Sequence, residues 1–247
     1  MAERDFVAVQ RSYYRHADPE HFRWQADSPY FAAMEAELVN PVTVGTGERL
    51  LEIGCGEGGN LFHLRRQPGA RFGVDFSPAK AAFAKAAGVA DTAAADAARL
   101  PFVDGAFDAV LIRDLLHHVS DRAAALAEAR RILRPGGRLT VIEPNVHSPL
   151  VALQATLIRA ERGLFRSNAR RLVSELADAG FVLRSSRTAQ PLPVERVLLN
   201  PRFGWTRLGA LRSVQAMLQG LDWVARKVLP QRFWMYLVFV ATKPEDR

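Results

Sequence analysis

Cysteine is the rarest residue of this 247-residue chain, which contains it only at position 55. A single cysteine cannot form an intrachain disulfide, and it cannot supply a zinc site built from several cysteines. Since disulfides belong to oxidising compartments, their absence is consistent with the reducing cytoplasm. We expect Cys55 to have a packing role and not to act as a catalytic thiol.

Long apolar runs are also missing. The longest strongly apolar stretch covers residues 233–241, far fewer than the ~20 residues of a membrane-spanning helix. The N-terminal residues Glu3, Arg4 and Asp5 carry charges, and this region lacks the apolar segment of a signal peptide. The sequence therefore predicts a soluble cytoplasmic protein and leaves open a peripheral position at the membrane.

Lysine contributes only four of the 33 basic residues, so arginine carries most of the positive charge. Residues 1–150 hold 17 basic and 19 acidic side chains, whereas residues 151–247 hold 16 and 7. Such an excess suits an anionic acceptor, a membrane surface or a nucleic acid near the C-terminal part. An arginine-rich composition with a solvated helix face explains the same excess.

Strand and helix signals alternate from residue 49 onward, which is typical of βαβ units in a mainly parallel sheet. Strands are expected near 49–53, 71–75, 89–95, 106–112, 138–143, 181–188 and 233–242. Helices are expected over 59–66, from a cap at Ser77 to Gly88, from Ser120-Asp121 to Leu133, over 146–165, from a cap at Ser167 to Gly180, and over 205–229. A turn is expected at Pro135, and a proline-containing loop is expected over 191–201.

Residues 50–59 (Leu-Leu-Glu-Ile-Gly-Cys-Gly-Glu-Gly-Gly) run from an apolar strand through a glycine cluster into a helix. Glycine permits positive φ and close approach of a ligand to the backbone, and the helix N-terminus offers free N–H groups. Gly54, Gly56 and Gly59 match a dinucleotide site, whereas Gly54, Gly56 and Gly58 match an adenosyl site. A tight turn without a ligand has the same pattern.

Four further segments follow the glycine cluster: 95–97 (Ala-Asp-Ala), 100–108, 115–119 (Leu-Leu-His-His-Val) and 133–137 (Leu-Arg-Pro-Gly-Gly). Together the five segments resemble the class I S-adenosylmethionine-dependent methyltransferases, especially the small-molecule group that includes the ubiquinone and menaquinone methylases. The resemblance covers residues 48–143, about 40% of the chain.

The resemblance implies an α/β fold with a doubly wound, seven-stranded, mainly parallel sheet in the order 3-2-1-4-5-7-6, whose last strand is antiparallel. We expect a single domain over residues 1–247 with a helical cover. Residues 1–40 would form an aromatic N-terminal lid, residues 41–145 the cofactor-binding core, and residues 146–166 and 190–232 helical insertions that cover the substrate.

The cofactor that the resemblance implies is S-adenosyl-L-methionine, and no metal is expected. Gly54, Gly56 and Gly58 would line its methionine and ribose portions, while Glu52 would orient the turn or a water at its amino group. The carbonyl of Arg113 would meet the methionine ammonium.

The nucleoside part of the cofactor would contact residues after the second and third strands. Asp75 offers two acceptor oxygens for two ribose hydroxyls. Asp96 would accept from the adenine amino group, the Ala97 backbone would pair with a ring nitrogen, and Phe76 would pack on the base. As acids at strand ends and in loops, Asp75 and Asp96 also suit simple turns.

Methyl transfer from a sulfonium mainly requires alignment and exclusion of water, so a strong base is optional. A histidine near neutrality can take the proton of an oxygen acceptor, and the candidates are His117 and His118. His118 matches the histidine of the family pattern, but packing over the cofactor is equally compatible. Glu143 follows the fifth strand, together with Asn145 and His147, where acceptor-contacting residues gather.

The sequence says less about the identity of the acceptor than about the cofactor. Residues 112–115 (Ile-Arg-Asp-Leu) lack the Asn/Asp-Pro-Pro-aromatic turn of enzymes that methylate exocyclic base amines, so DNA is not expected. Aromatic residues in the lid either enclose an apolar acceptor or anchor the lid. The amphipathic segment 205–229 lies at a bilayer, encloses a lipophilic substrate or packs on the core.

From these features we expect methyl transfer to a small, lipophilic or lipid-linked acceptor, at oxygen in preference to carbon, with weak association to a membrane surface. Two alternatives remain. One is a peripheral membrane protein that binds the cofactor. The other is an RNA methyltransferase, for which no RNA-binding module is evident.

Overall fold

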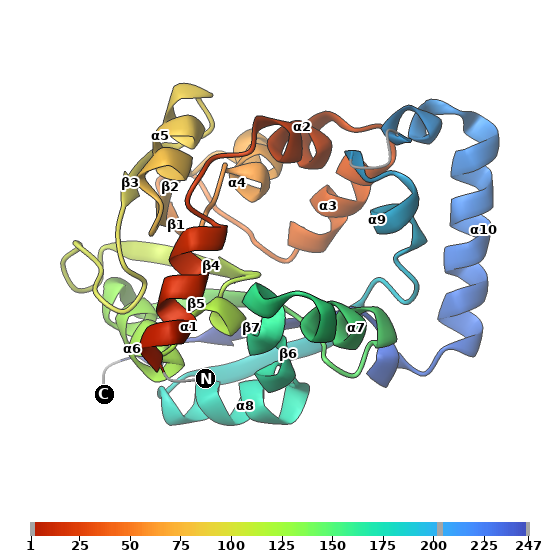
Figure 1. Cartoon of the computed structure of the whole chain (residues 1–247). Helices are drawn as coiled ribbons and strands as arrows, with labels where there is room; N and C mark the ends of the chain where they lie inside the picture. The colour runs from red at the N-terminus through yellow and green to blue at the C-terminus, as the bar shows by residue number, and fades with distance from the viewer. Residues whose placement is uncertain (1–2, 202–204, 246–247) are drawn as a thin grey trace.

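The computed structural model describes residues 3–201 and 205–245, and a seven-stranded sheet crosses its centre (Figure 1). The strands are β1 (Arg49–Ile53), β2 (Ala70–Asp75), β3 (Asp91–Ala94), β4 (Phe107–Arg113), β5 (Leu133–Pro144), β6 (Val182–Ala189) and β7 (Tyr236–Thr242). Their order is β3-β2-β1-β4-β5-β7-β6, and β7 runs antiparallel to both neighbours. The expected sheet order and the reversed last strand are confirmed.

Helices cover both faces of this sheet. They are α1 (Glu3–Tyr13), α2 (Pro19–Asp27), α3 (Phe31–Val39), α4 (Gly59–His63), α5 (Pro78–Ala86), α6 (Arg122–Ile132), α7 (Pro149–Leu157), α8 (Ala169–Asp178), α9 (Val194–Leu198) and α10 (Arg212–Val228). Side chains alternate along each strand, so Leu51 joins the core cluster with α6 and α8, whereas Leu50 joins the cluster with α3 and α4. Two apolar cores therefore hold the sheet between helical layers.

The cap of α6 lies within the expected Ser120-Asp121 pair, whereas the cap of α8 lies one residue later than expected. Asp121 caps α6 by accepting from the Ala124 N–H, and Asn168 caps α8 by accepting from the Arg171 N–H. Ser167 was expected to cap α8, but its hydroxyl lies 3.4 Å from a carboxylate oxygen of Glu143 instead. Both Asp and Asn are strong N-cap residues, so the local chemistry is as expected and only the position differs.

Two elements in the second half of the chain, β5 and the helix expected over 146–165, differ from expectation. β5 begins at Leu133, and its register against β4 shifts between Phe107 and Ala109, because the 135–137 turn forms a bulge whose Gly136 N–H donates to the Lys243 carbonyl. The expected helix over 146–165 is divided into α7 and the 3-10 helix η3 (Arg159–Arg166).

The segment 191–201 was expected to be a loop, which is wrong, since it contains the short helix α9. Pro193 stands directly before this helix, and proline is well tolerated at a helix start. Similarly, the segment expected as one helix over 205–229 consists of a 3-10 turn, Thr206–Ala210, followed by α10. Among the helices of the described residues, none combines the length and apolarity needed to cross a bilayer.

Candidate functional site

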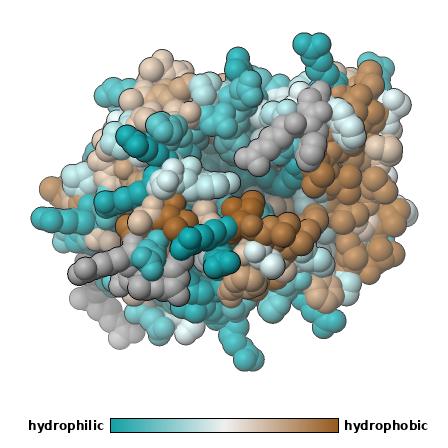
Figure 2. All heavy atoms as spheres, in the orientation of Figure 1, coloured by the Kyte–Doolittle hydropathy of each residue, from teal (hydrophilic) through white to brown (hydrophobic). Residues whose placement is uncertain are grey.

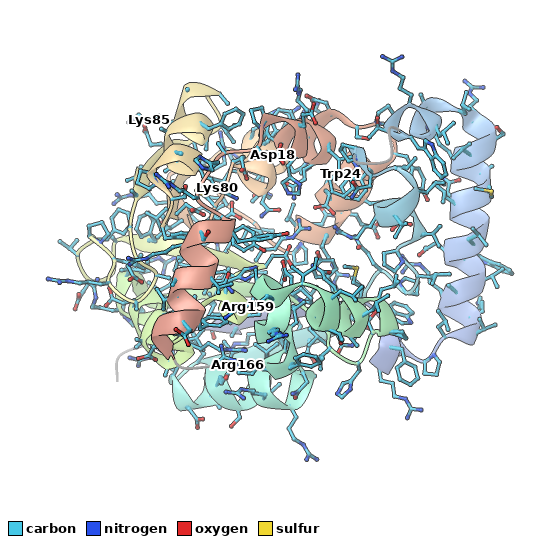
Figure 3. The ribbon with its side chains drawn as sticks, in the orientation of Figure 1. Asp18, Trp24, Lys80, Lys85, Arg159 and Arg166 are labelled. Atoms are coloured by element: carbon cyan, nitrogen blue, oxygen red, sulfur yellow. The ribbon has the colours of Figure 1, made fainter. Side chains whose placement is uncertain are left out.

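A cavity of about 630 Å³ opens at the carboxyl ends of β1, β2 and β4. Ligands of open α/β sheets bind at this edge, where the strand order reverses. The walls come from the strand-end turns, from α1, α2 and α9, and from η3. Trp24 of α2 and Lys80 of α5, both labelled in Figure 3, line the cavity from different helices.

The glycine turn after β1 forms part of the floor. Gly54 and Gly56 have positive φ, +78° and +52°, and both line the cavity. A Cβ added to Gly56 would meet no atom within 4 Å, so this glycine faces open space, whereas one added to Gly54 would lie 2.8 Å from the Leu115 side chain. Gly56 therefore leaves room for a ligand against the backbone.

The third glycine of the expected adenosyl pattern has a different position. Gly58 has φ +87° at the N-cap of α4 and is not among the residues that line the cavity. Its added Cβ would lie 3.2 Å from Ala84 and Val89, so Gly58 lets α4 pack closely on α5. Gly59, the third glycine of the dinucleotide spacing, does line the cavity.

Asp75 is held rigidly at the end of β2. Its Oδ2 accepts the Gly56 N–H at 2.9 Å and its Oδ1 accepts the Ser77 N–H at 2.8 Å. Burial raises the pKa of Asp75, and these two N–H donors partly offset that shift. Each oxygen keeps a further lone pair, so the carboxylate can still accept from a ligand.

Phe76, Asp96 and Ala97 line the cavity beyond Asp75. Asp96 is held by the Ala98 N–H, which donates to its Oδ1 at 2.9 Å. The exposed ring of Phe76 offers an apolar surface beside these polar groups. The structure therefore brings an aromatic face and two carboxylates to the lining of one cavity.

Glu52 lies beneath the turn, fully buried and outside the residues that line the cavity. Asn60 donates to its Oε1, and its Oε2 has no hydrogen-bond partner among the described residues. Burial raises the pKa of Glu52 to about 8. Burial therefore disfavours the charged form of Glu52, and its position beneath the turn keeps it out of direct contact with the cavity.

Arg113, at the end of β4, belongs to an ion network that joins the sheet to the cover. Its guanidinium donates to Asn60 Oδ1 at 2.6 Å and to Glu35, which also pairs with Arg196 of α9. Burial opposes the charge of Glu35, but Arg113 and Arg196 lower its pKa to about 2. Glu35 was not among the expected site residues, because the sequence does not distinguish it from Glu37, an exposed acid two residues later on the same helix.

His117 and Glu143 form a buried pair. Glu143 Oε2 lies 2.7 Å from His117 Nδ1, and Glu143 Oε1 accepts the N–H groups of Leu115 and Leu116 at 2.8 Å. Glu143 is fully buried and does not line the cavity, so it anchors the 3-10 turn η2 (Leu116–His118). Asn145 is likewise occupied, because its amide donates to the carbonyls of Arg232 and Trp234.

Glu161 of η3 completes this polar cluster. His117 Nε2 lies 3.5 Å from a Glu161 oxygen, and Tyr14 of α1 donates to the other oxygen at 2.6 Å. Burial alone would lower the pKa of His117, but the two carboxylates raise it to about 10. Burial opposes ionisation of Glu161, yet the His117 hydrogen bond and the histidine charge lower its pKa to about 2. The two carboxylates therefore favour the charged form of His117.

His118 has the opposite electrostatic environment. Burial and the neighbouring positive charge of His117 lower the pKa of His118 to about 3. Its Nδ1 has no hydrogen-bond partner among the described residues, and its ring centroid lies 4.7 Å from that of Tyr14. His118 therefore presents a neutral imidazole to the cavity at physiological pH.

Close packing positions η3 beside the histidines. A Cβ added to Gly163 would lie 1.7 Å from the His117 carbonyl oxygen, so only glycine allows this approach. Arg166, labelled in Figure 3 together with Arg159 of the same element, donates to the Val119 carbonyl at 3.1 Å. The sequence around Glu161 contains no motif that predicts its role. Its contact with Tyr14 joins residues 147 positions apart along the chain.

Donor atoms of His117, His118 and Glu161 lie within 4.8 Å of one another, so they form a grouping that could hold a metal ion. The donor chemistry does not require one. His117 Nδ1 and Nε2 already lie 2.7 Å and 3.5 Å from carboxylate oxygens of Glu143 and Glu161, so both carboxylates have a partner within the protein.

Methyltransferases are among the known proteins that this chain is similar to. A protein family described as "Methyltransferase domain" matches residues 51–141. The chain is 37% identical over 148 residues to a demethylmenaquinone methyltransferase of Mycolicibacterium paratuberculosis, covering 60% of this chain and 63% of that protein. It is 34% identical over 163 residues to the enzyme so named in Mycobacterium marinum, covering 66% and 69%. The chain thus spans about two thirds of the length of these relatives.

Solved structures share the fold. One is a phosphoethanolamine N-methyltransferase of Haemonchus contortus in complex with S-adenosyl-L-methionine, at a TM-score of 0.67 and 20% identity over 99% of this chain and 60% of that chain. Another is a geranyl diphosphate C-methyltransferase of Streptomyces coelicolor, at a TM-score of 0.65 and 18% identity over 96% and 98%. At these identities the likeness concerns the fold alone.

Proposed function

Because the chain belongs to the class I S-adenosylmethionine-dependent methyltransferases, we propose that it methylates a hydroxyl oxygen of a small, lipophilic acceptor. The observation that carries this proposal is the continuity of the cavity. Gly56, Asp75 and Asp96 line one part of it, and His118 and Tyr14 line another. A cofactor and an acceptor would therefore meet inside one cavity.

The residues present fit S-adenosylmethionine, which supplies an electrophilic methyl group when bound. Gly56 leaves an open cradle for it, and Asp75 would accept from its ribose hydroxyls. Asp96 and the Ala97 backbone would recognise the adenine edge, with Phe76 against the ring. Because Glu52 keeps one buried oxygen unpaired, it can support the turn at the amino-acid end of the cofactor.

His118 is the residue we propose to accept the acceptor proton. A neutral imidazole can orient a hydroxyl through a hydrogen bond and then take its proton as the oxygen–carbon bond forms. The low pKa of His118 does not prevent this step, because an oxygen that has gained a methyl group and still carries its proton is a far stronger acid than an imidazolium. Tyr14 and Glu161 would position this ring through the polar cluster.

Apolar residues at the cavity support a lipophilic acceptor. Leu150 of α7 and Val197 of α9 line the cavity and are exposed to solvent as well. Met235 and Tyr236 add apolar surface from the start of β7. The names of the relatives point to a quinone-type compound as the acceptor class, and a reduced quinone carries the hydroxyl group that His118 would deprotonate.

Isotopically labelled S-adenosylmethionine tests the proposal when the purified protein is incubated with a panel of reduced benzoquinones and naphthoquinones. We expect a labelled O-methyl product by mass spectrometry. His118→Gln should lower kcat about 100-fold, at the lower end of proton-transfer effects, and leave the cofactor Kd unchanged in calorimetry. The matched control is His147→Gln, since His147 is exposed and lies outside the cavity lining.

A label on carbon would overturn the choice of oxygen, since phenol deprotonation also activates ring carbons. Cofactor binding without a labelled product from any lipophilic acceptor would contradict the proposed acceptor class. Equal losses in the His118 and His147 variants would contradict the role of His118.

A further inference from the structure

α10 buries one apolar stripe and exposes another. Leu218 and Ala225 face the protein, where Leu218 packs in a cluster with Trp24 and Phe31. A second stripe recurs at the spacing of one helix face and is exposed, with Val228 67% accessible. Its members are Met217, Leu221, Val224 and Val228.

α7 repeats this arrangement beside the cavity. Val151 and Ala155 are buried, whereas Leu150, Leu153 and Leu157 are exposed on the opposite side, Leu157 to 73%. Figure 2 shows hydrophobic residues gathered over α10 and over α7 on the same face of the molecule. Contiguous apolar surface of this kind marks an interaction site.

Basic side chains accompany the apolar surface. Arg212 and Lys227 are exposed on α10, and Lys227 Nζ lies 5.9 Å from the Trp223 ring centroid. Arg226 pairs with Asp222, the one acid of this helix. Residues 151–247 together hold 16 basic and 7 acidic side chains, so this part of the protein is positively charged.

We propose that the exposed faces of α7 and α10 dock on an anionic lipid bilayer. An amphipathic helix with basic flanks and a tryptophan lies at a bilayer interface, and each basic residue near an anionic surface adds to its affinity. Charge argues against a second copy of this chain as the occupant. Two positively charged faces would repel each other, whereas anionic headgroups complement both.

The docking surface borders the cavity. Leu150 belongs to both, because it is an exposed residue of α7 and a lining residue of the cavity. A protein docked on the bilayer would therefore take up a lipophilic acceptor directly from the lipid, and the acceptor would not have to pass through water. This last step rests on the proposed function, whereas the docking itself does not.

Sedimentation with vesicles of phosphatidylcholine containing about a third phosphatidylglycerol tests the proposal. At low salt we expect the protein to bind these vesicles and to bind pure phosphatidylcholine at least tenfold more weakly. The double variant Leu221→Asn/Val224→Asn should reduce binding at least tenfold. Its matched control is Val103→Asn, an even more exposed aliphatic residue on the loop before β4, and this variant should bind as the unmodified protein does.

The charge contribution has its own pair of variants. Arg212→Gln/Lys227→Gln should weaken binding to the anionic vesicles about 30-fold, roughly fivefold for each charge, whereas Lys85→Gln on α5 should leave it unchanged. Thermal unfolding of every variant checks that the fold is retained.

Three results would overturn the docking proposal. They are no vesicle binding at low salt, equal binding by the stripe variant and its control, and a dimer in analytical ultracentrifugation that the stripe variant dissociates without any vesicle binding. Turnover of a water-soluble acceptor, measured without vesicles, distinguishes a failure of the docking proposal from a failure of the proposed function. The stripe variant should retain this turnover, and its absence in all variants would contradict the proposed function alone.

Discussion

The floor and the cover of the cavity are built in different ways. The floor consists of turns after β1, β2 and β4, whose backbone N–H groups are bonded at the strand ends. The Gly54 and Cys55 N–H groups both donate to the Val74 carbonyl, and the Gly56 N–H donates to Asp75. The cover consists of α1, α2, η3 and α9, which side chains hold in place. The floor therefore has a geometry that local sequence specifies, whereas the position of the cover depends on contacts between distant segments.

The largest effect is expected from filling the floor. Gly56→Leu should place a side chain in the open cradle and abolish S-adenosylmethionine binding, with a loss above about 1000-fold in calorimetry. Gly47→Leu is the matched control, because Gly47 has φ +79° and also meets no atom within 4 Å of an added Cβ. Both variants should lose similar stability from backbone strain. Binding by the Gly56 variant would place the cofactor elsewhere.

Glu35 joins the floor to the cover, because it pairs with Arg113 of β4 and Arg196 of α9. Glu35→Gln should lower the free energy of unfolding by about 3–5 kcal/mol, since two buried guanidiniums lose their shared carboxylate. Glu37→Gln changes an exposed neighbour on the same helix and should cost less than about 0.5 kcal/mol. Urea unfolding measures both, and equal costs would show that the network does not hold the cover.

A smaller, pH-dependent effect is expected from His117, which joins η2 to η3. Its pKa is raised to about 10 in the folded protein from about 6.5 in an unfolded chain. The stabilisation is therefore complete below pH 6.5 and is lost as the pH rises toward 10.

Urea unfolding at pH 6, 8 and 10 measures this effect as the stability difference between the unmodified protein and His117→Gln. The difference should be about 2 kcal/mol at pH 6, the size of a hydrogen bond between charged groups, and should shrink at higher pH. A difference that stays constant with pH would mean that His117 is neutral in the fold.

Chelation should have the smallest effect. Because His117 carries a proton between two carboxylates, we expect treatment with excess EDTA to leave methyl transfer unchanged within about twofold. Activity that EDTA removes and a divalent cation restores would identify His117, His118 and Glu161 as metal ligands.

The sequence indicated the floor in detail. Asp75, Asp96 and the glycine turn all follow strands that their own apolar pattern predicts, and short backbone turns place them at one sheet edge. The same reasoning misplaced Glu143 at the acceptor, because a strand-end position does not reveal that its oxygens are consumed by Leu115, Leu116 and His117. Gly58 likewise fits a binding pattern but packs against α5.

The sequence by itself determined most of the strands and helices and the glycine turn of the floor, because these depend on periodicity, glycine conformation and residues close along the chain. The order of the strands and the cofactor class followed from the resemblance of its motifs to a known family. Only the tertiary structure decided which histidine is charged, since burial and carboxylates from β5 and η3 set the pKa of His117 and, through it, that of His118. It also decided which face of α10 is exposed, because an amphipathic pattern does not say which of two apolar stripes the protein covers.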